Sequence, residues 1–299
     1  MPTDNPIILD SLLGSLCSAA LDGNVDQIRS ILAQPPEGFE QDFSLALRWA
    51  AKSGHRECVE LLLPWSDPKS GESAALRYAA EFGHAGCVAC LLPLSEPEAL
   101  NSYALRWAAT NGHEECVKLL IPNPLAEHNE FPALCMAASK NHFECVKLLI
   151  PVSNAKQDDS YALRIASARG HAECVKLLAP VSEPGVRHHE ALRMAAKNGH
   201  AECVGLLLPF FGRIGADNIL LASALENGRH EIVGLILERE AELLEVLDFP
   251  LLRENALRRN LHALAALLSS IIERRAISAS LGDPLAALSH APPPFKSRL

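Results

Sequence analysis

Apolar residues recur along this chain at two helical spacings, separated by a short polar break. In the segment ALRWAAKSGHRECVELLLP, residues 46–64, the first apolar stripe begins at Ala46 and continues at i+1, i+4 and i+5. Gly54 interrupts the pattern, a second stripe begins at Cys58, and Pro64 follows. This spacing predicts two amphipathic helices joined by a tight turn. Glycine suits the positive φ with which many helices end, and proline stops the second helix.

The same pattern returns in five further segments, so the chain contains a tandem array. Their glycines, with one asparagine, follow one another at steps of 29 residues. The near-copies are ALRYAAEFGHAGCVACLLP (75–93), ALRWAATNGHEECVKLLIP (104–122), ALCMAASKNHFECVKLLIP (133–151), ALRIASARGHAECVKLLAP (162–180) and ALRMAAKNGHAECVGLLLP (191–209). Weaker copies fit residues 16–32, 220–237 and 251–268. A fixed period of this kind predicts an all-α solenoid, in which each unit buries its apolar face against its neighbours.

Polar residues at fixed slots predict how the helices begin and what they expose. A serine two residues before the Ala-Leu pair is a suitable N-cap for the first helix, as at Ser44, Ser73, Ser102 and Ser160. Several second helices carry glutamate and lysine at i,i+3, for example Glu115 and Lys118. Such pairs stabilise an exposed helix face by a few tenths of a kcal/mol.

The core A-L-x-x-A-A-x-x-G-H-x-x-C-V-x-L-L-L resembles the ankyrin repeat, P-L-H-x-A-A-x-x-G-H-x-x-V-V-x-L-L-L, over roughly residues 16–268. The usual ankyrin period is about 33 residues. The residues missing here fall between Pro64 and Ala75, where the family has its β-hairpin finger. The resemblance therefore implies an α-solenoid of about seven to nine helix-turn-helix units with little or no β-hairpin. Another helical-pair repeat is the structural alternative, although its usual period is longer.

This interpretation divides the chain into four parts. We expect an N-terminal helix and capping repeat over residues 1–45, tandem repeats over 46–237, a degenerate repeat over 238–268, and a C-terminal helix with a Pro-rich tail over 269–299. The last part is interpreted as a terminal cap, with a flexible peptide that docks elsewhere as the alternative.

Composition narrows the class of partner. Hydrophobic residues make up 48% of the chain and aromatic residues only 5%, which favours thin, closely stacked helices. The net charge of −9 disfavours nucleic acid as a partner. No apolar run approaches the roughly 20 residues that span a membrane, and residues 1–14 lack the pattern of a signal peptide. We therefore expect a cytoplasmic, monomeric protein that binds neither membrane nor nucleic acid.

Cysteine and histidine each recur at one slot of the repeat, and we call each series a ladder. Neither ladder indicates disulfides or a metal site. Stacked repeats lie roughly 10 Å apart, too far for a disulfide or a shared zinc ion. We interpret the cysteines as small buried apolar side chains, and the resemblance gives the histidines a packing and hydrogen-bonding role. The ladders are Cys58, Cys87, Cys116, Cys145, Cys174, Cys203 and His55, His84, His113, His142, His171, His200. Since no catalytic or nucleotide-binding motif is present either, we expect no catalytic residue, metal or cofactor.

Two further ladders on the first helices are candidates for binding a partner. One holds Arg48, Arg77, Arg106, Arg164 and Arg193. Either each guanidinium bonds loop carbonyls or a nearby glutamate, or the ladder is a basic stripe for an acidic partner. The next slot holds Trp49, Tyr78, Trp107, Met136, Ile165 and Met194. The resemblance places this slot on the concave surface, and packing between adjacent repeats is the alternative.

We predict seven partner-binding residues, because interfaces are enriched in Trp, Tyr, Met and Arg. They are the anchors Trp49, Tyr78, Trp107 and Met136, the polar residues Arg77 and Arg106, and Phe82 as an extension of the patch. The predicted function is non-catalytic binding of another protein on the concave face, as a scaffold or adaptor.

Two other classes of function remain open at this point. An inhibitor or immunity-type protein that blocks an enzyme or toxin would use the same surface. An enzyme would have to use residues 236–299, which contain His262 and His290 but no nucleophile–base pattern. Because ankyrin-like arrays are common in bacterial effectors, delivery of the chain into a host cell is a further expectation, made by analogy.

Overall fold

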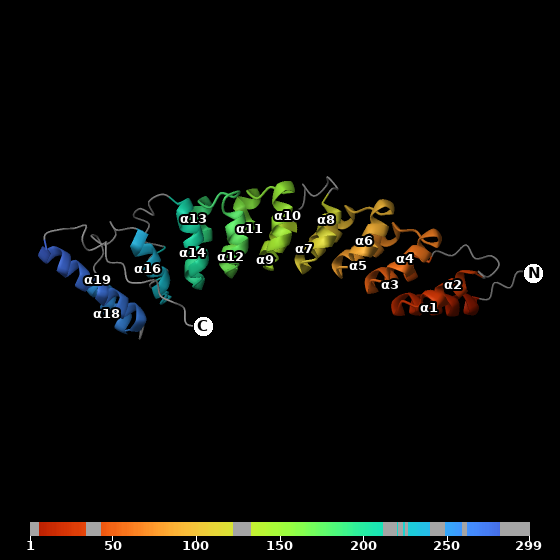
Figure 1. Cartoon of the computed structure of the whole chain (residues 1–299), viewed down its shortest axis with the longest axis horizontal. Coiled ribbons are helices and arrows are strands. Elements are labelled where there is room, and N and C mark those ends of the chain that lie inside the picture. Colours follow the sequence, from red (N-terminus) through yellow and green to blue (C-terminus); the bar gives the residue numbers. More distant parts are fainter. Residues whose placement is uncertain are drawn as a thin grey trace, which may run out of the picture.

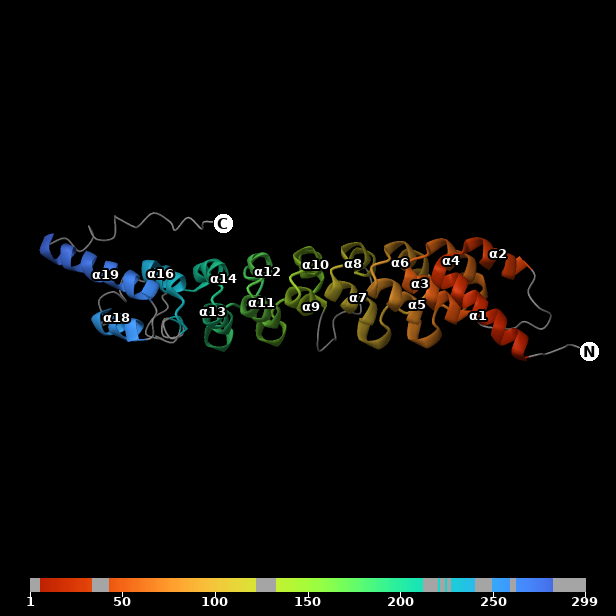
Figure 2. The same cartoon turned by 90° about the horizontal axis from the view of Figure 1, so that it is seen from below.

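The structure is a computed structural model that describes residues 6–33, 43–121, 133–211, 227–239, 249–258 and 262–281, with residues 220 and 224. Within these residues the helices follow one another in pairs, and no residue is in a β-strand. The molecule is elongated and bends into a shallow arc (Figure 1). Turned by 90°, it shows two parallel rows of helices (Figure 2).

The first helix of every pair lies in one row and the second helix in the other. The first row holds α1 (Pro6–Asp22), α3 (Ser44–Ser53), α5 (Ser70–Glu81), α7 (Ala99–Asn111), α9 (Ala133–Ser139), α11 (Gln157–Arg169) and α13 (Val186–Asn198). The second row holds α2 (Val25–Ala33), α4 (Arg56–Leu62), α6 (Ala85–Leu91), α8 (Glu114–Leu120), α10 (Phe143–Leu149), α12 (Ala172–Leu178) and α14 (Ala201–Leu207). Short 3-10 helices follow several of them: η1 (Leu63–Trp65), η2 (Leu92–Leu94), η4 (Ile150–Val152) and η5 (Leu208–Phe210). Within each row, every helix packs against its counterpart in the next repeat.

The C-terminal end of the array is less regular. Helix α16 (His230–Arg239) packs on α14, and α19 (His262–Leu281) packs on α16 and on α18 (Phe249–Arg258). Helix α19 continues through residue 268, where the expected division between the degenerate repeat and the tail falls. The Pro-rich part of the expected tail, residues 282–299, lies outside the described residues. No helix among those described is long and apolar enough to cross a membrane.

The core is a continuous line of the apolar slots predicted from the sequence. In the first clear repeat, Ala46, Leu47, Cys58 and Val59 are fully buried, and their counterparts in the following repeats are buried as well. The cysteines of the ladder are free thiols inside this core. Their predicted role as small buried apolar side chains is therefore confirmed.

The glycine and histidine of each turn connect one repeat to the next. Gly112 ends α7 with a φ of 77°, and a Cβ built there would lie 2.5 Å from the ring of His142 in the next repeat. Glycine is thus favoured both by the backbone and by the neighbouring ring. In the opposite direction, His113 Nε2 donates a 3.0 Å hydrogen bond to the carbonyl of Glu81. Equivalent bonds join His55 to Leu21, His84 to Lys52, His171 to Ser139 and His200 to Ala168, so the structural role of this ladder is confirmed.

The serines do not cap their own helices, and that prediction is wrong. The N-cap positions of α3, α5, α7 and α11 are held by Phe43, Lys69, Glu98 and Lys156, and none of these caps its helix with a side-chain hydrogen bond. Ser73 Oγ instead accepts a 2.8 Å hydrogen bond from the backbone N–H of Glu96, in the loop of the following repeat. Ser44 and Ser160 do the same for Asp67 and Glu183. The serine is therefore a second connection between repeats.

A left-handed turn stands where the ankyrin resemblance would place a finger. The segments Gly71–Ser73, Leu100–Ser102 and Asp158–Ser160, within α5, α7 and α11, have φ values between 49° and 60°. A residue other than glycine costs roughly 1–2 kcal/mol in this conformation. The turn therefore needs compensating contacts, and the arginine ladder supplies them.

Candidate functional site

The predicted anchors lie on the row of first helices, one in each successive repeat. Trp49 is on α3, Tyr78 on α5, Trp107 on α7 and Met136 on α9. All four side chains are half-buried. They therefore pack on the array and still present part of their surface to solvent. This result is intermediate between the two interpretations of the slot, a binding surface and packing between adjacent repeats.

Three of the predicted residues surround a lysine. Lys52 Nζ lies 5.2 Å from the ring centroid of Trp49. The same nitrogen is 5.4 Å from the ring of Phe82 and 6.0 Å from that of Tyr78. We call Trp49, Lys52, Tyr78 and Phe82 the Lys52 cluster. Aromatic faces attract a cation, and Phe82 leaves 45% of its surface exposed beside it.

A second aromatic pair continues the patch into the next repeat. Tyr103 and Trp107 have ring centroids 5.6 Å apart, at an interplanar angle of 34°. The Tyr103 hydroxyl donates a 3.1 Å hydrogen bond to Glu81, and Arg77 Cζ lies 5.0 Å from the Tyr103 centroid. Burial, followed by the bond to Glu81, raises the pKa of Tyr103 above its usual value. The Lys52 cluster and this pair together form an aromatic patch over α3, α5 and α7.

The two predicted arginines are held by their own chain. Arg77 Nε donates to the carbonyl of Glu72 at 2.9 Å, and its Nη2 donates to that of Gly71 at 2.8 Å. Arg106 Nη2 donates to the carbonyl of Leu100 at 3.1 Å. Each guanidinium thus binds carbonyls of the left-handed turn that precedes it. This is the intramolecular alternative for the ladder, and the predicted role in selecting a partner stays untested.

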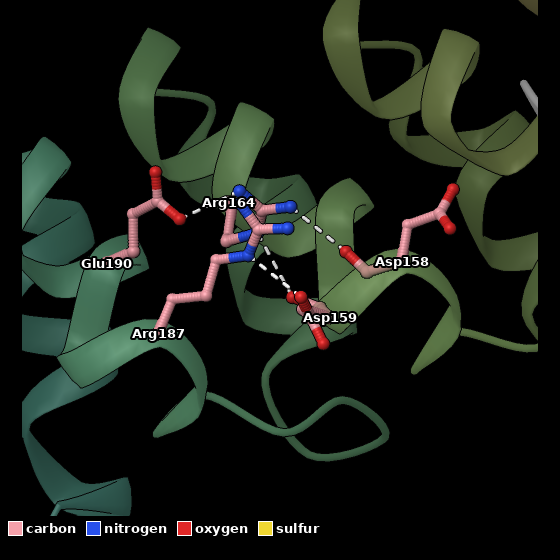
Figure 3. A network of polar contacts seen from close by, with 5 residues as sticks. All are labelled: Asp158, Asp159, Arg164, Arg187 and Glu190. Carbon is pink, nitrogen blue, oxygen red and sulfur yellow. Dashed lines mark hydrogen bonds and ion pairs between the residues drawn. The ribbon is translucent and has the colours of Figure 1, made fainter.

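The arginine slot makes its fullest network in the C-terminal repeats (Figure 3). Arg164 donates from Nη2 and Nε to the carbonyls of Asp158 and Asp159, at 2.9 and 3.0 Å. Its Nη1 also pairs with Glu190 of the next repeat at 2.8 Å, with side chains only 11% and 21% exposed. Arg187 donates to the Asp159 carboxylate at 2.8 Å from the side of the next repeat. Two of the three left-handed residues, Asp158 and Asp159, are therefore held by charged contacts.

Met136 stands apart from the aromatic patch. Its neighbour Cys135 takes the arginine slot on α9 and is 7% exposed. Burial raises the pKa of the Cys135 thiol to about 12. The structure describes no ring or cation contact for Met136, and residues 122–132, which precede α9, lie outside the described residues.

Three residues of this patch, Lys52, Glu81 and Tyr103, are not among the seven predicted partner-binding residues. Helical spacing could have found two of them, because Lys52 follows Trp49 by three residues and Tyr103 precedes Trp107 by four. The link from Tyr103 to Glu81 joins adjacent repeats, so no spacing within one helix predicts it.

The ladder thiols of the array are buried, and the imidazoles of five repeats hydrogen-bond to backbone carbonyls of the preceding repeat. Burial raises the pKa of Cys87 to about 12, and that of Cys116, Cys145, Cys174 and Cys203 to about 11. A neutral thiol is a poor nucleophile and a poor metal ligand. Burial also lowers the pKa of His171. The described part of the chain contains no group of three or more His, Cys, Asp or Glu side chains placed to hold a metal ion.

Comparison with known proteins identifies the repeat. A family model described as ankyrin repeats (3 copies) matches residues 16–102, 76–162, 105–188 and 163–245. The crystal structure of the human ASB11 ankyrin repeat domain superposes with a TM-score of 0.52 at 21% sequence identity, covering 70% of this chain and 96% of that domain. At that identity the likeness concerns the fold alone. No curated protein matches the sequence.

Proposed function

This chain belongs to the ankyrin-repeat family, and from that premise we propose that its first-helix row binds another protein, with the aromatic patch as the main contact. Arrays of this family are protein–protein interaction modules. The Lys52 cluster carries the proposal. It gathers aromatic surface and a cation in a chain whose aromatic content is only 5%, and aromatic residues are the commonest hot spots of interfaces.

The mechanism is binding by a surface that is already formed. The backbone beneath the patch is fixed by the histidine, serine and arginine contacts within and between repeats. A partner therefore gains contact area on Trp49, Tyr78, Trp107 and Phe82 without having to order the scaffold. We place Met136, Arg77 and Arg106 at the margin of this surface.

We further infer that the protein acts as a monomer in a reducing compartment, either the cytosol of the cell that makes it or that of a host. The support is its free, buried thiols. Unpaired cysteines in such number are typical of proteins that do not meet an oxidising environment.

The test is capture of a partner by the wild type and by surface variants of the whole chain. Phe82→Ser removes an exposed ring from the patch, and Phe143→Ser is its matched control, since Phe143 is 42% exposed at the start of α10 in the other row. We expect Phe82→Ser, and more strongly Trp49→Ala/Trp107→Ala, to reduce capture at unchanged helicity. Equal capture by Phe82→Ser and the wild type would contradict the proposal.

The stoichiometry of the captured complex and the partner's remaining activity distinguish a scaffold from an inhibitor. A scaffold or adaptor binds its partner and leaves the partner's activity intact. An inhibitor or immunity-type protein forms a tight one-to-one complex in which the partner's activity is lost. Titration of the partner's activity against the chain therefore decides between these two uses of one surface.

A further inference from the structure

The lysines of the two helix rows differ in their partners. Every described lysine of the second helices and of the loops between repeats forms an ion pair with glutamate: Lys69, Lys118, Lys147, Lys156 and Lys176. The lysines of the first-helix row, Lys52, Lys140 and Lys197, have no ion pair among the described residues. In an acidic chain with a net charge of −9, carboxylates are plentiful, and the first helices carry several of their own, so the lack of an ion pair at these three lysines is a local feature of the described residues.

Three of the unpaired cations follow one another along consecutive repeats. Lys140 lies just beyond the end of α9, Arg169 is the last residue of α11, and Lys197 is in the last turn of α13. All three side chains are exposed. We call Lys140, Arg169 and Lys197 the basic ridge. Arg169 donates one hydrogen bond, from Nη1 to the carbonyl of Ser139 at 2.7 Å, and makes no ion pair among the described residues.

Two carboxylates close to the ridge in sequence are engaged elsewhere, whereas Glu202 at the start of α14 makes no ion pair among the described residues. Glu144 and Glu173, at the starts of the next second helices, pair with Lys147 and Lys176 of their own helices. The ridge is therefore a row of positive charge along the edge of an otherwise acidic molecule.

The helix dipole does not account for the ridge. A cation in the last turn of a helix is stabilised by unsatisfied carbonyls. Here the carbonyl of Ser139 accepts from both Arg169 and His171. The carbonyl of Ala168 accepts from Asn198 and His200. The carbonyls at the ends of α9 and α11 are thus satisfied by the next repeat, and the carbonyl of Lys197 in α13 accepts a longer bond from Arg229 at 3.5 Å. The exposed ammonium groups of Lys140 and Lys197 are therefore available to an external anion.

The ridge continues the aromatic patch without a gap in the array. The patch covers α3, α5 and α7, and the ridge covers the ends of α9, α11 and α13, which are the next first helices. Packed helices lie about 8–10 Å apart, and an extended chain rises about 3.3 Å per residue. One repeat therefore matches about three residues of an extended ligand.

Resting on the proposed function, we propose that the partner contacts this row with an extended acidic segment. Its carboxylates, at every third residue, pair with Lys140, Arg169 and Lys197, and an apolar or aromatic residue at one end packs on the Lys52 cluster. A nucleic-acid backbone is an anion as well, and we favour a peptide because one chain can supply both carboxylates for the ridge and an apolar residue for the Lys52 cluster.

The test uses a synthetic peptide of about 18 residues, the length that spans six repeats at about three residues each. It has glutamate at every third position of one half and a Phe-Leu pair in the other, and it is made in both sequence directions. Its binding to the full-length chain is measured by fluorescence anisotropy. A peptide with glutamine at every glutamate position and a duplex DNA oligonucleotide serve as comparison probes.

Two triple variants with the same change of charge separate the ridge from overall electrostatics. Lys140→Glu/Arg169→Glu/Lys197→Glu reverses the ridge, and Lys118→Glu/Lys147→Glu/Lys176→Glu reverses three lysines of the second-helix row. We expect the first to weaken peptide binding by about tenfold or more, and the second by less than about twofold. Binding to the wild type should fall as salt is added.

Several outcomes would overturn the inference. These are equal losses in the two triple variants, equal binding of the glutamine peptide, or DNA that binds more tightly than the peptide and is lost with the ridge. If Phe82→Ser abolishes partner capture while the ridge variant keeps it, the proposed interface stands and the acidic ligand is rejected. If neither variant affects capture, both proposals fail.

Discussion

The repeats of residues 44–121 and those of residues 133–211 share one backbone and carry two different surfaces. In the N-terminal group, Arg77 lies over the ring of Tyr103 in the next repeat. In the C-terminal group, Arg164 occupies the same slot and pairs with Glu190, which corresponds to Tyr103 three repeats on. Each guanidinium holds the left-handed turn before it. They differ in their contact with the next repeat, and Arg164 also lies 5.3 Å from the ring of Tyr161 in its own repeat. The left-handed turn thus requires the arginine, whereas the residue that the arginine meets in the next repeat, Tyr103 or Glu190, varies.

The next slot shows the same division. It is aromatic at Trp49, Tyr78 and Trp107, and aliphatic at Ile165 and Met194, with all these side chains half-buried. Since the core slots hardly change between the two groups, this difference concerns the surface and a partner more than the stability of the array.

The largest expected effect comes from replacing the arginine of this slot in each group of repeats. Arg164→Met loses two carbonyl bonds and a contact with the Tyr161 ring, and it leaves Glu190, which is only 21% exposed, without its cation. We expect the free energy of unfolding to fall by on the order of 2–3 kcal/mol.

The matched variant Arg77→Met loses two carbonyl bonds and a ring contact but leaves no charge unpaired. Its loss should be smaller, on the order of 1–2 kcal/mol. Urea unfolding of both variants, followed by circular dichroism, measures the difference. An equal or larger loss for Arg77→Met would show that the ion pair of Arg164 with Glu190 contributes little to the stability of the array.

Exchange of side chains between the groups tests whether the aromatic slot serves stability or binding. Trp107→Ile gives α7 the residue that α11 carries and removes the pair with Tyr103, at a cost of about 1 kcal/mol. We expect this variant to remain helical and to lose partner capture. The reciprocal change, Ile165→Trp, should leave capture unaltered, and a Trp107→Ile protein that captures its partner normally would move the interface off this slot.

The smallest effect concerns the pKa of Tyr103. Burial and the hydrogen bond to Glu81 raise this pKa, so the folded state holds the phenolic proton more tightly than the unfolded state does. The resulting stability is present below the usual pKa of tyrosine, about 10, and is lost as pH rises through the higher folded-state value.

Glu81→Gln should bring the Tyr103 pKa back toward its usual value, because the carboxylate that disfavours the phenolate is gone. Ultraviolet absorbance of the tyrosinate over an alkaline titration measures this change. Tyr103→Phe is the control that assigns the titration, and an unchanged curve in Glu81→Gln would mean that burial alone accounts for the shift.

The fold could be predicted well from the sequence because the same two-helix pattern occurs in six clear copies. The Gly54 turn, the Cys58 slot and the stop at Pro64 all follow from properties of single residues, and the structure has them where they were expected. Helix propensity and apolar spacing are local, so a single chain is enough to infer them.

Contacts between repeats were harder to predict, for a geometric reason. Ser73 was interpreted as an N-cap because that is what a serine before a helix does in isolation. Its hydrogen-bond partner, Glu96, lies in the next repeat. The left-handed turn at Glu72 and Ser73 could not be predicted either, because the conformational preferences of these residues do not favour a positive φ. The site shows the same limit, since Lys52 meets Tyr78 and Phe82 only once two repeats are stacked.

The connections between repeats have a consequence for how such a gene can change. His113 reaches the carbonyl 32 residues before it, and Ser73 reaches the N–H 23 residues after it, so each bond ends in the adjacent unit. A recombination event that adds or removes one 29-residue unit therefore presents every partner again at the new junction. A longer step is tolerated at the N-terminal end, where His55 still bonds the carbonyl of Leu21, 34 residues before it. The array is thus free to lengthen by whole copies, and each new copy supplies one more surface position on which selection can act.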